Sequence, residues 1–235
     1  GMNLQLNRED VVANNLANIN TTGYKKDEVT CTSFEEELFL ALDRSGITPI
    51  GTASLGVEVD GVFTHLTPGN YITTGNSLDL SIAGDGYFLV ESPSGRYLTR
   101  NGNFTKSADG YLVTSEGDRV IGANGPVRLD NRQVNIAQDG AILIDGQITD
   151  RLLIVLPTDQ ASLMKEGSSH FRLTGGWTRV ENPQINQGEL ENSNVNPIEE
   201  MTKMIAVTRA YESNQKVIAV MDEVMNKIAN ELGRV

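Results

Sequence analysis

The fold is organised around the stretch from Asn196 to Leu232, which runs NPIEEMTKMIAVTRAYESNQKVIAVMDEVMNKIANEL. Apolar residues recur in this stretch at alternating steps of three and four, which is the spacing of a heptad seam along one helix. The seam consists of Met204, Val207, Tyr211, Ile218, Met221, Met225, Ile228 and Leu232, with Asn214 in place of one apolar member. The pattern predicts a single long helix at the carboxy-terminal end of the chain.

Both ends of this predicted helix carry the expected signals. Asn196 can accept hydrogen bonds from the first-turn amides, and Pro197 suits the first helical position. Glu199 and Glu200 complement the positive end of the helix dipole, and Gly233 favours a stop. At about 1.5 Å per residue the helix would be roughly 55 Å long, which is more than a domain of this size covers, so we expect it to need a partner helix.

The amino-terminal end of the chain supplies a candidate partner. A weaker seam with the same spacing is formed by Met2, Gln5, Glu9, Val12, Leu16 and Ile19. Gly23 can adopt the left-handed conformation that ends a helix, so we predict that the first helix stops there. We expect the two terminal helices to pair as a coiled coil.

Three amide side chains, Asn14, Asn15 and Asn18, lie in this first segment, although asparagine disfavours helix interiors. Two interpretations are open. The segment is a solvated, poorly formed helix end, or its amides bond across a helix interface, where one polar position fixes register and partner. On the second interpretation these residues and Asn214 set the register of packing.

The negative charge of the protein lies in the middle of the chain. The 235 residues carry a formal net charge of −12, with 39% hydrophobic residues and 23 glycines. Residues 1–26 contribute +1 and residues 196–235 contribute −1, so residues 27–195 account for the whole −12. An acidic middle argues against nucleic acid as a partner, because the phosphates would be repelled.

Several other classes of protein are excluded by composition. No apolar run is long enough to predict a membrane span. The amino-terminal stretch is charged and amide-rich, so it does not have the apolar region of a cleaved signal peptide. Cys31 is the one cysteine, which excludes an intramolecular disulfide and a cysteine-based zinc site.

The middle of the chain changes to the two-residue periodicity of strands. We predict strands at 57–60, 78–82, 87–91, 111–114, 119–121, 141–144 and 152–156. Hairpin turns are predicted between apolar runs at Pro93-Ser94-Gly95, Asp109-Gly110, Glu116-Gly117, Asp139-Gly140 and Asp145-Gly146. Ser33-Phe34-Glu35-Glu36 has the form of a capping box and predicts a short helix through Leu38, Leu40 and Ala41. We therefore predict a mainly β chain with α-helical termini and an antiparallel sandwich or barrel as its body.

Three stretches resemble one known family. The first is ANNLANINTTGYK at 13–25, and the second combines DLSIAGDGYF at 79–88 with LTRNGNF at 98–104 and GYLVT at 110–114. The third is QGELENSNVN at 187–196, together with the helix that follows it. All three are similar to motifs of the bacterial flagellar basal-body rod and hook family, in the same order.

The resemblance implies a structural subunit, of the proximal or distal rod, that assembles helically into the periplasm-spanning rod and transmits torque from motor to hook. It implies that the terminal helices form the inner tube and that the β domain projects outward. The implied partners are further copies of the chain, neighbouring rod and hook axial proteins, and the flagellar export apparatus, which uses no cleaved signal peptide. Members of the family usually have further residues ahead of the position of Gly1, so the first helix is expected to be shorter here.

We expect five parts in the chain. They are an amino-terminal helix of a helical domain (1–26), a connector with a short helix and the first strand (27–59), a β-rich outer domain (60–185), a return connector (186–195) and the long carboxy-terminal helix (196–235). A seam that is only partly buried in one chain leaves apolar surface for neighbouring subunits, and a repeated contact that does not close generates a filament. The predicted assembly interface consists of Val12, Asn14, Asn15, Leu16, Asn18, Ile19, Met204, Val207, Tyr211, Asn214, Ile218, Met221, Met225 and Ile228.

An enzyme is the first alternative. His65 and His170 are the two histidines, and neither has a metal-ligand spacing, so we expect both to be surface or strand residues. Gly84-x-Gly86 lacks the third glycine and the helix of a dinucleotide loop, and neither Ser92–Gly95 nor Gly167–His170 has the setting of a nucleophile elbow. We therefore predict no catalytic residue, no cofactor and no metal.

A second alternative is a β binding module of the adhesin or carbohydrate-binding type on a helical stalk. An aromatic platform could be formed by Tyr71, Tyr87, Tyr97, Tyr111 and Trp177. Aromatic residues on alternating strands more often lie in a core, which favours the rod subunit over the module.

Overall fold

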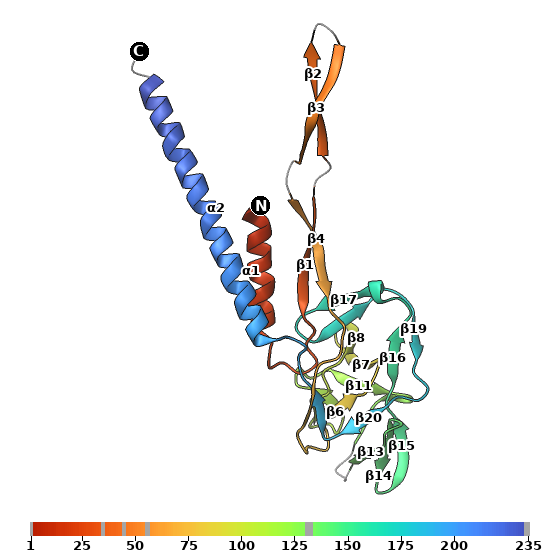
Figure 1. The fold of residues 1–235 in the computed structure, drawn as a ribbon. Helices are drawn as coiled ribbons and strands as arrows, with labels where there is room; N and C mark the ends of the chain where they lie inside the picture. The colour runs from red at the N-terminus through yellow and green to blue at the C-terminus, as the bar shows by residue number, and fades with distance from the viewer. Residues whose placement is uncertain (1, 34–35, 44–45, 55–56, 130–133, 233–235) are drawn as a thin grey trace. The chain divides into compact units, whose positions relative to one another are not determined.

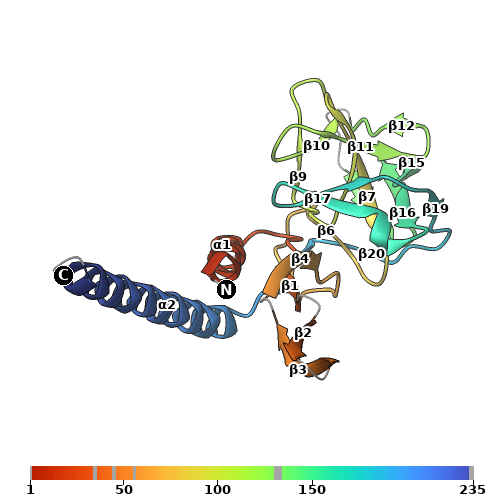
Figure 2. The ribbon, with the colours of Figure 1, turned by 90° about the horizontal axis from the view of Figure 1, so that it is seen from above.

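The computed structural model describes residues 2–33, 36–43, 46–54, 57–129 and 134–232 (Figure 1, and Figure 2 from above). The chain divides into two compact units. The helical unit comprises Gly1–Leu16, Asp27–His65 and Asn196–Val235, and the β unit comprises Ala17–Lys26 and Leu66–Val195. Mainly β structure with a helix at each end is confirmed.

The long carboxy-terminal helix is confirmed as α2, which spans Pro197–Leu232. The side-chain oxygen of Asn196 accepts hydrogen bonds from the amides of Ile198 at 3.1 Å and Glu199 at 3.5 Å, which is the capping arrangement expected from the sequence. Along the exposed face, Lys203 pairs with Glu199 at 2.7 Å across one turn. The expected stop at Gly233 lies outside the described residues.

The first helix, α1, spans Met2–Ala17. It therefore ends before Gly23, so the prediction that Gly23 stops the helix is corrected. Gly23 does have a left-handed backbone, with φ of 68°, but its role lies in the β unit. A Cβ atom on Gly23 would lie 2.4 Å from the backbone nitrogen of Asn101, so only glycine allows this approach of two backbones. Neither helix is long and apolar enough, over its described residues, to cross a membrane.

Four strands complete the helical unit as two nested antiparallel pairs. β1 (Asp27–Ser33) pairs with β4 (Val57–Thr64), and β2 (Glu36–Asp43) pairs with β3 (Gly46–Ser54) between them in sequence. The short helix predicted from the capping box is therefore wrong, because its residues from Glu36 onward form β2. An isolated helix of this length is marginal in water, whereas β3 pairs with Glu36–Asp43 along its whole length, with one register shift between Phe39 and Leu40.

The β unit contains the remaining strands, all of which pair in antiparallel fashion. They are β5 (Tyr71–Thr73), β6 (Leu80–Ile82), β7 (Tyr87–Ser92), β8 (Gly95–Thr99), β9 (Phe104–Lys106), β10 (Leu112–Thr114), β11 (Arg119–Gly122), β12 (Gly125–Pro126), β13 (Val134–Ile136), β14 (Ala141–Ile144), β15 (Gln147–Arg151), β16 (Ile154–Pro157), β17 (Leu163–Glu166), β18 (His170–Leu173), β19 (Trp177–Arg179), β20 (Ile185–Gln187) and β21 (Glu189–Glu191), with the short 3-10 helix η1 at Gln160–Ser162. Each of the five glycine turns predicted from the sequence separates two of these strands.

A ten-stranded sheet forms the body of the β unit, and its main path runs β17-β18-β8-β7-β11-β10-β9. β16 joins it at β7, β19 at β16 and β12 at β11. Smaller groups are the three-stranded β13-β14-β15 and the pairs β20-β6 and β21-β5. Over the described residues this sheet ends at β9 and β17, so the body is not a closed barrel.

β7 lies at the centre of the sheet and is buried on both faces. Phe88 and Val90 belong to the larger core cluster, while Tyr87 and Leu89 belong to a second cluster on the opposite face. Because successive side chains of a strand point to opposite faces of the sheet, β7 contributes to both core clusters. The larger cluster also includes Ile142 of β14 and Ile185 of β20, so it joins the ten-stranded sheet to two of the smaller groups.

Candidate assembly interface

The residues predicted for assembly differ in how far the single chain covers them. On α1, Val12 is buried, while Leu16 is half-buried, as is Ile19 beyond the helix end. On α2, half-buried side chains are found at Met204, Val207, Tyr211 and Asn214, and exposed ones at Ile218, Met221, Met225 and Ile228. The seam of α2 is thus partly covered over its first half and uncovered over the second.

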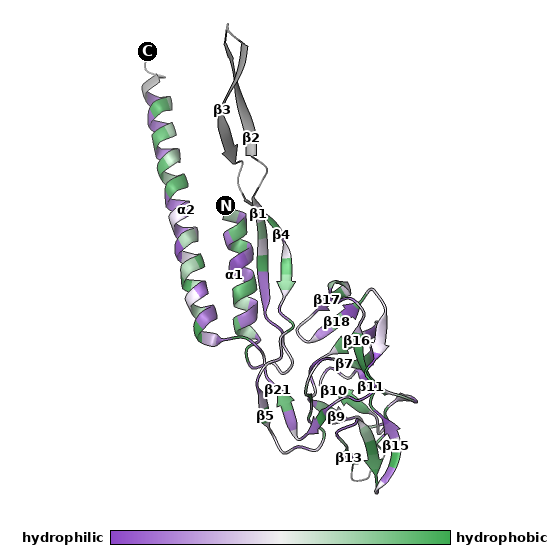
Figure 3. Cartoon of the chain, turned by 45° about the vertical axis from the view of Figure 1, so that its right-hand side comes forward, coloured by the Kyte–Doolittle hydropathy of each residue, from purple (hydrophilic) through white to green (hydrophobic). Residues whose placement is uncertain are grey.

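The uncovered surface of α2 is wider than a two-position seam. Its exposed large apolar side chains are Ile198, Met201, Ile205, Val217, Ile218, Val220, Met221, Val224, Met225 and Ile228. Figure 3 shows hydrophobic residues continuing along α2 toward its carboxy-terminal end. Glu200 is the one buried residue of α2 among those whose burial is described. The exposed apolar residues from Val217 to Ile228 form the longer of its two groups, and exposed apolar surface of this kind typically marks a protein interface.

A buried amide holds three elements of the helical unit together. Asn15 of α1 donates from Nδ2 to the backbone oxygen of Asp27 at 2.8 Å and accepts at Oδ1 from the Asp27 amide at 3.0 Å. The same Nδ2 donates to Oε2 of Glu200 at 3.1 Å. Asn15 and Glu200 are each 1% exposed, so neither group can exchange these bonds for water. This amide therefore fixes the start of β1 and the first turn of α2 against α1.

The other amides proposed to set register are placed differently. Asn14 is exposed on α1, and Asn18 follows the helix, where its Oδ1 accepts from the Thr21 hydroxyl at 3.2 Å. Asn214 is half-buried on α2. Within one chain, Asn15 is the member of the set that forms a hydrogen bond from α1 to α2. Its partner Glu200 was considered in the sequence only for its effect on the helix dipole.

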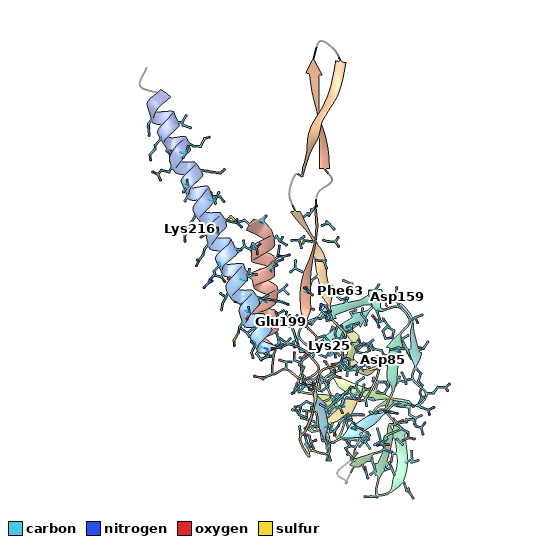
Figure 4. The ribbon with its side chains drawn as sticks, in the orientation of Figure 1. Lys25, Phe63, Asp85, Asp159, Glu199 and Lys216 are labelled. Atoms are coloured by element: carbon cyan, nitrogen blue, oxygen red, sulfur yellow. The ribbon has the colours of Figure 1, made fainter. Side chains whose placement is uncertain are left out.

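A buried cluster of three charged side chains occupies the β unit. Nζ of Lys25 forms an ion pair with Oε1 of Glu191, and both side chains are completely buried. Nη1 of Arg100 lies 3.2 Å from Oε2 of the same carboxylate. Lys25 also donates to the backbone oxygen of Thr67 at 2.9 Å, and Arg100 to that of Ile82 at 3.2 Å. Figure 4 shows Lys25 among the side chains of this region.

The surroundings of the cluster influence the pKa values of its members and neighbours. Burial lowers the pKa of Lys25, and the carboxylate of Glu191 opposes this change. Burial raises the pKa of Tyr87, whose ring lies 5.3 Å from the Arg100 guanidinium carbon. Arg100 opposes that rise and Glu191 adds to it. Lys25 and Arg100 are two cations beside the one carboxylate of Glu191. Each cation also donates to a backbone oxygen, so the cluster holds distant segments of the β unit together.

The two residues that precede Lys25, Gly23 and Tyr24, also contact the β strands of this unit. The Gly23 amide donates to the backbone oxygen of Glu191 at 2.8 Å. Tyr24 is fully buried, and Nζ of Lys165 lies 3.7 Å from the centre of its ring. The same Nζ donates to the backbone oxygen of Lys25 at 2.6 Å. The chain between α1 and β1 is therefore fixed to the body of the β unit.

Comparison with known proteins identifies the family. The model "Flagella basal body rod protein" matches residues 1–25, "Flagellar hook protein FlgE/F/G D1 domain" matches 81–144, and "Flagellar basal body rod FlgEFG protein C-terminal" matches 186–232. The chain is 35% identical to the flagellar basal-body rod protein FlgF of Caulobacter vibrioides over 99% of its length and 95% of that protein. It is 36% identical to FlgG of Agrobacterium fabrum, over 99% of this chain and 96% of that protein, and 34% identical to FlgG of Bacillus subtilis, over 94% and 92%. This chain belongs to the flagellar basal-body rod protein family.

As a rod-family protein it is a structural axial component of the flagellar basal body. In this chain the buried cluster joins the three matched segments. Lys25 lies in the first matched segment, Arg100 in the second and Glu191 in the third. Each segment contributes one charge to a single ion cluster, so the motifs are parts of one tertiary feature.

The structure does not contain the exposed aromatic platform that the binding-module alternative requires of Tyr71, Tyr87, Tyr97, Tyr111 and Trp177. Tyr87 and Tyr97 are buried, at 5% and 6% exposure, while Trp177 of β19 and Tyr71 of β5 are exposed. The five aromatic residues do not therefore form one exposed set.

Proposed function

We propose that this chain assembles with further copies of itself and with neighbouring rod and hook axial proteins through the exposed apolar face of α2. The observation that carries the proposal is the uncovered second half of the heptad seam. Ile218 is 46% exposed and Met225 is 68% exposed, although both stand at seam positions that a partner helix would cover.

The energetic argument is that assembly buries this surface. Complete burial of an Ile or Met side chain contributes about 1.5–3 kcal/mol, so several such residues per subunit supply a substantial driving force. A contact between different surfaces of neighbouring copies that does not close generates a helical filament, which is the form of a rod. Such a role needs exposed apolar surface and a rigid subunit, and it is structural rather than catalytic.

We further propose that residues 1–26 and 196–235 contribute to the inner, helical part of the rod. The β-rich region near 60–185 would then project outward, with 27–59 and 186–195 as connectors. The proposal includes export by the flagellar export apparatus without a cleaved signal peptide. Support comes from membership of the rod family and from the amphipathic character of both terminal helices.

Sedimentation velocity of the full chain over a wide range of concentrations tests the role of α2. We expect wild-type chains to form assemblies that grow with concentration, and Ile218→Asp to remain monomeric, because a carboxylate in the seam would be buried without a partner at a cost of several kcal/mol. Ser213→Asp is the matched control, because it adds the same charge at an exposed position of α2 outside the seam.

The two variants separate the possible results. Loss of assembly in Ile218→Asp with wild-type behaviour in Ser213→Asp supports the proposal, provided that circular dichroism shows equal helix content. Equal assembly of both variants, or a wild-type chain that stays monomeric at every concentration, contradicts it.

A further inference from the structure

One cluster of potential metal ligands lies in the β unit, and it shares no residue with the Lys25 cluster. Glu116, Asp118 and His170 each place one ligand atom so that all three atoms lie within 4.8 Å of one another. Nδ1 of His170 lies 3.4 Å from a carboxylate oxygen of Glu116, and Nε2 lies 3.2 Å from one of Asp118. The three residues line a surface cavity of about 470 Å³.

The fold holds these ligands on separate, well-fixed elements. Glu116 and Asp118 flank Gly117 in the turn from β10 to β11, where the Asp118 amide donates to the Thr114 hydroxyl at 3.1 Å. His170 begins β18 and is paired with Thr99 of β8. Because these contacts position both the turn and the strand, the site is assembled by the fold without a ligand.

The charge balance of the cluster favours a cation. In the described part of the chain, His170 is the one basic group paired with either carboxylate. Glu166, the other acid in the cavity, is already paired with Arg172 at 2.7 Å. The side chain of Asp118 is only 9% exposed, so its charge is poorly solvated. Two carboxylates meet at this place, and one divalent ion would balance their charge.

We propose that Glu116, Asp118 and His170 bind a divalent transition-metal ion of the Zn²⁺ class. An imidazole nitrogen with two carboxylate oxygens suits Zn²⁺ better than Mg²⁺ or Ca²⁺, which prefer ligands that are all oxygen. Three protein ligands leave coordination positions for water from the cavity. The ion would join the β10–β11 turn to β18 and stabilise the β unit by binding the folded state.

The experiment is a calorimetric titration of the full chain with ZnCl₂ at about pH 7.5, because protein ligands bind a metal in their deprotonated forms. We expect one ion per chain, a higher thermal denaturation midpoint with Zn²⁺, and binding weakened at least about tenfold in His170→Ala, Asp118→Asn and Glu116→Gln. Asp118→Asn and Glu116→Gln keep the side-chain shape, so they test the site if His170→Ala fails to fold.

His65→Ala is the matched control, because His65 is the other histidine and, directly after β4, pairs with Glu28 of β1. It should bind Zn²⁺ as the wild type does. In proton NMR, only one of the two histidine ring signals should change on addition of Zn²⁺, and that signal should be absent from His170→Ala. Absence of binding, binding unaffected by the three ligand variants, or binding lost in His65→Ala overturns the proposal.

Discussion

Lys25 and Glu191 are separated by 166 positions in the chain, and their side chains form an ion pair with no exposure to solvent. Arg100 contacts the second oxygen of the same carboxylate. Because a buried charge is costly without its partner, the pair makes the folding of three distant segments interdependent.

Breaking this pair should destabilise the protein strongly. We expect Lys25→Met and Glu191→Gln each to lower the free energy of unfolding by about 3–5 kcal/mol, because each leaves a buried charge with fewer partners. Urea denaturation followed by circular dichroism measures the change.

The control for the buried pair is Arg96→Met, which removes an ion pair with Glu91 whose side chains are 64% and 41% exposed. Exposed pairs contribute about 0–1 kcal/mol, so the effect should be small. A similar loss of stability in Lys25→Met and Arg96→Met would show that burial does not account for the contribution of the Lys25–Glu191 pair to stability.

Removing the Asn15 amide should loosen the helical unit. Asn15→Ala removes two hydrogen bonds from the Asp27 backbone and one from the Glu200 carboxylate. We expect the free energy of unfolding to fall by about 1–3 kcal/mol. The amide proton of Asp27 should then exchange with solvent faster, which hydrogen-exchange NMR measures directly. Asn14→Ala, one residue away and exposed, should leave that proton protected, and equal exchange in the two variants would refute the role of Asn15.

Gly102 should not tolerate a side chain. A Cβ atom there would lie 1.7 Å from the backbone oxygen of Leu80, so Gly102→Ala forces two backbones apart, and we expect a loss of about 3 kcal/mol in the free energy of unfolding. Gly176→Ala is the control in the same unit, since its nearest neighbour would be a side-chain oxygen at 3.4 Å. If chemical denaturation gives equal free energies of unfolding for the two variants, the close approach of the Leu80 backbone is not the reason that glycine is needed at position 102.

Burial of Tyr87 should make the free energy of unfolding depend on pH in the alkaline range. Burial raises its pKa, so above about pH 10 the unfolded chain releases the phenolic proton while the folded chain keeps it, and the free energy of unfolding falls as pH rises. Tyr87→Phe should reduce this fall without abolishing it, because the pKa of Tyr71 is also raised by burial. Denaturation curves between neutral pH and about pH 11 measure the slopes, and parallel slopes for wild type and variant would contradict the expectation.

Local patterns predicted much of the fold. The three-and-four spacing and the capping residues predicted α2, because an amphipathic helix with its own caps depends mainly on neighbouring residues. The glycine turns predicted the strand boundaries for the same reason, since a left-handed position such as Gly110 imposes its conformation locally. The segment from Glu36 to Asp43 was misassigned, because its conformation depends on pairing with a second strand.

Sequence motifs and local periodicity were sufficient to predict the family, the helical ends and the alternating strands of the body. Tertiary structure alone decided which polar residues are buried together: Asn15 with Glu200, Lys25 with Glu191 and Arg100, and His170 with Asp118. In the sequence each of these is a single polar residue in a polar or capping context. Their partners lie on distant segments, and burial, which depends on the whole fold, is what makes each contact strong.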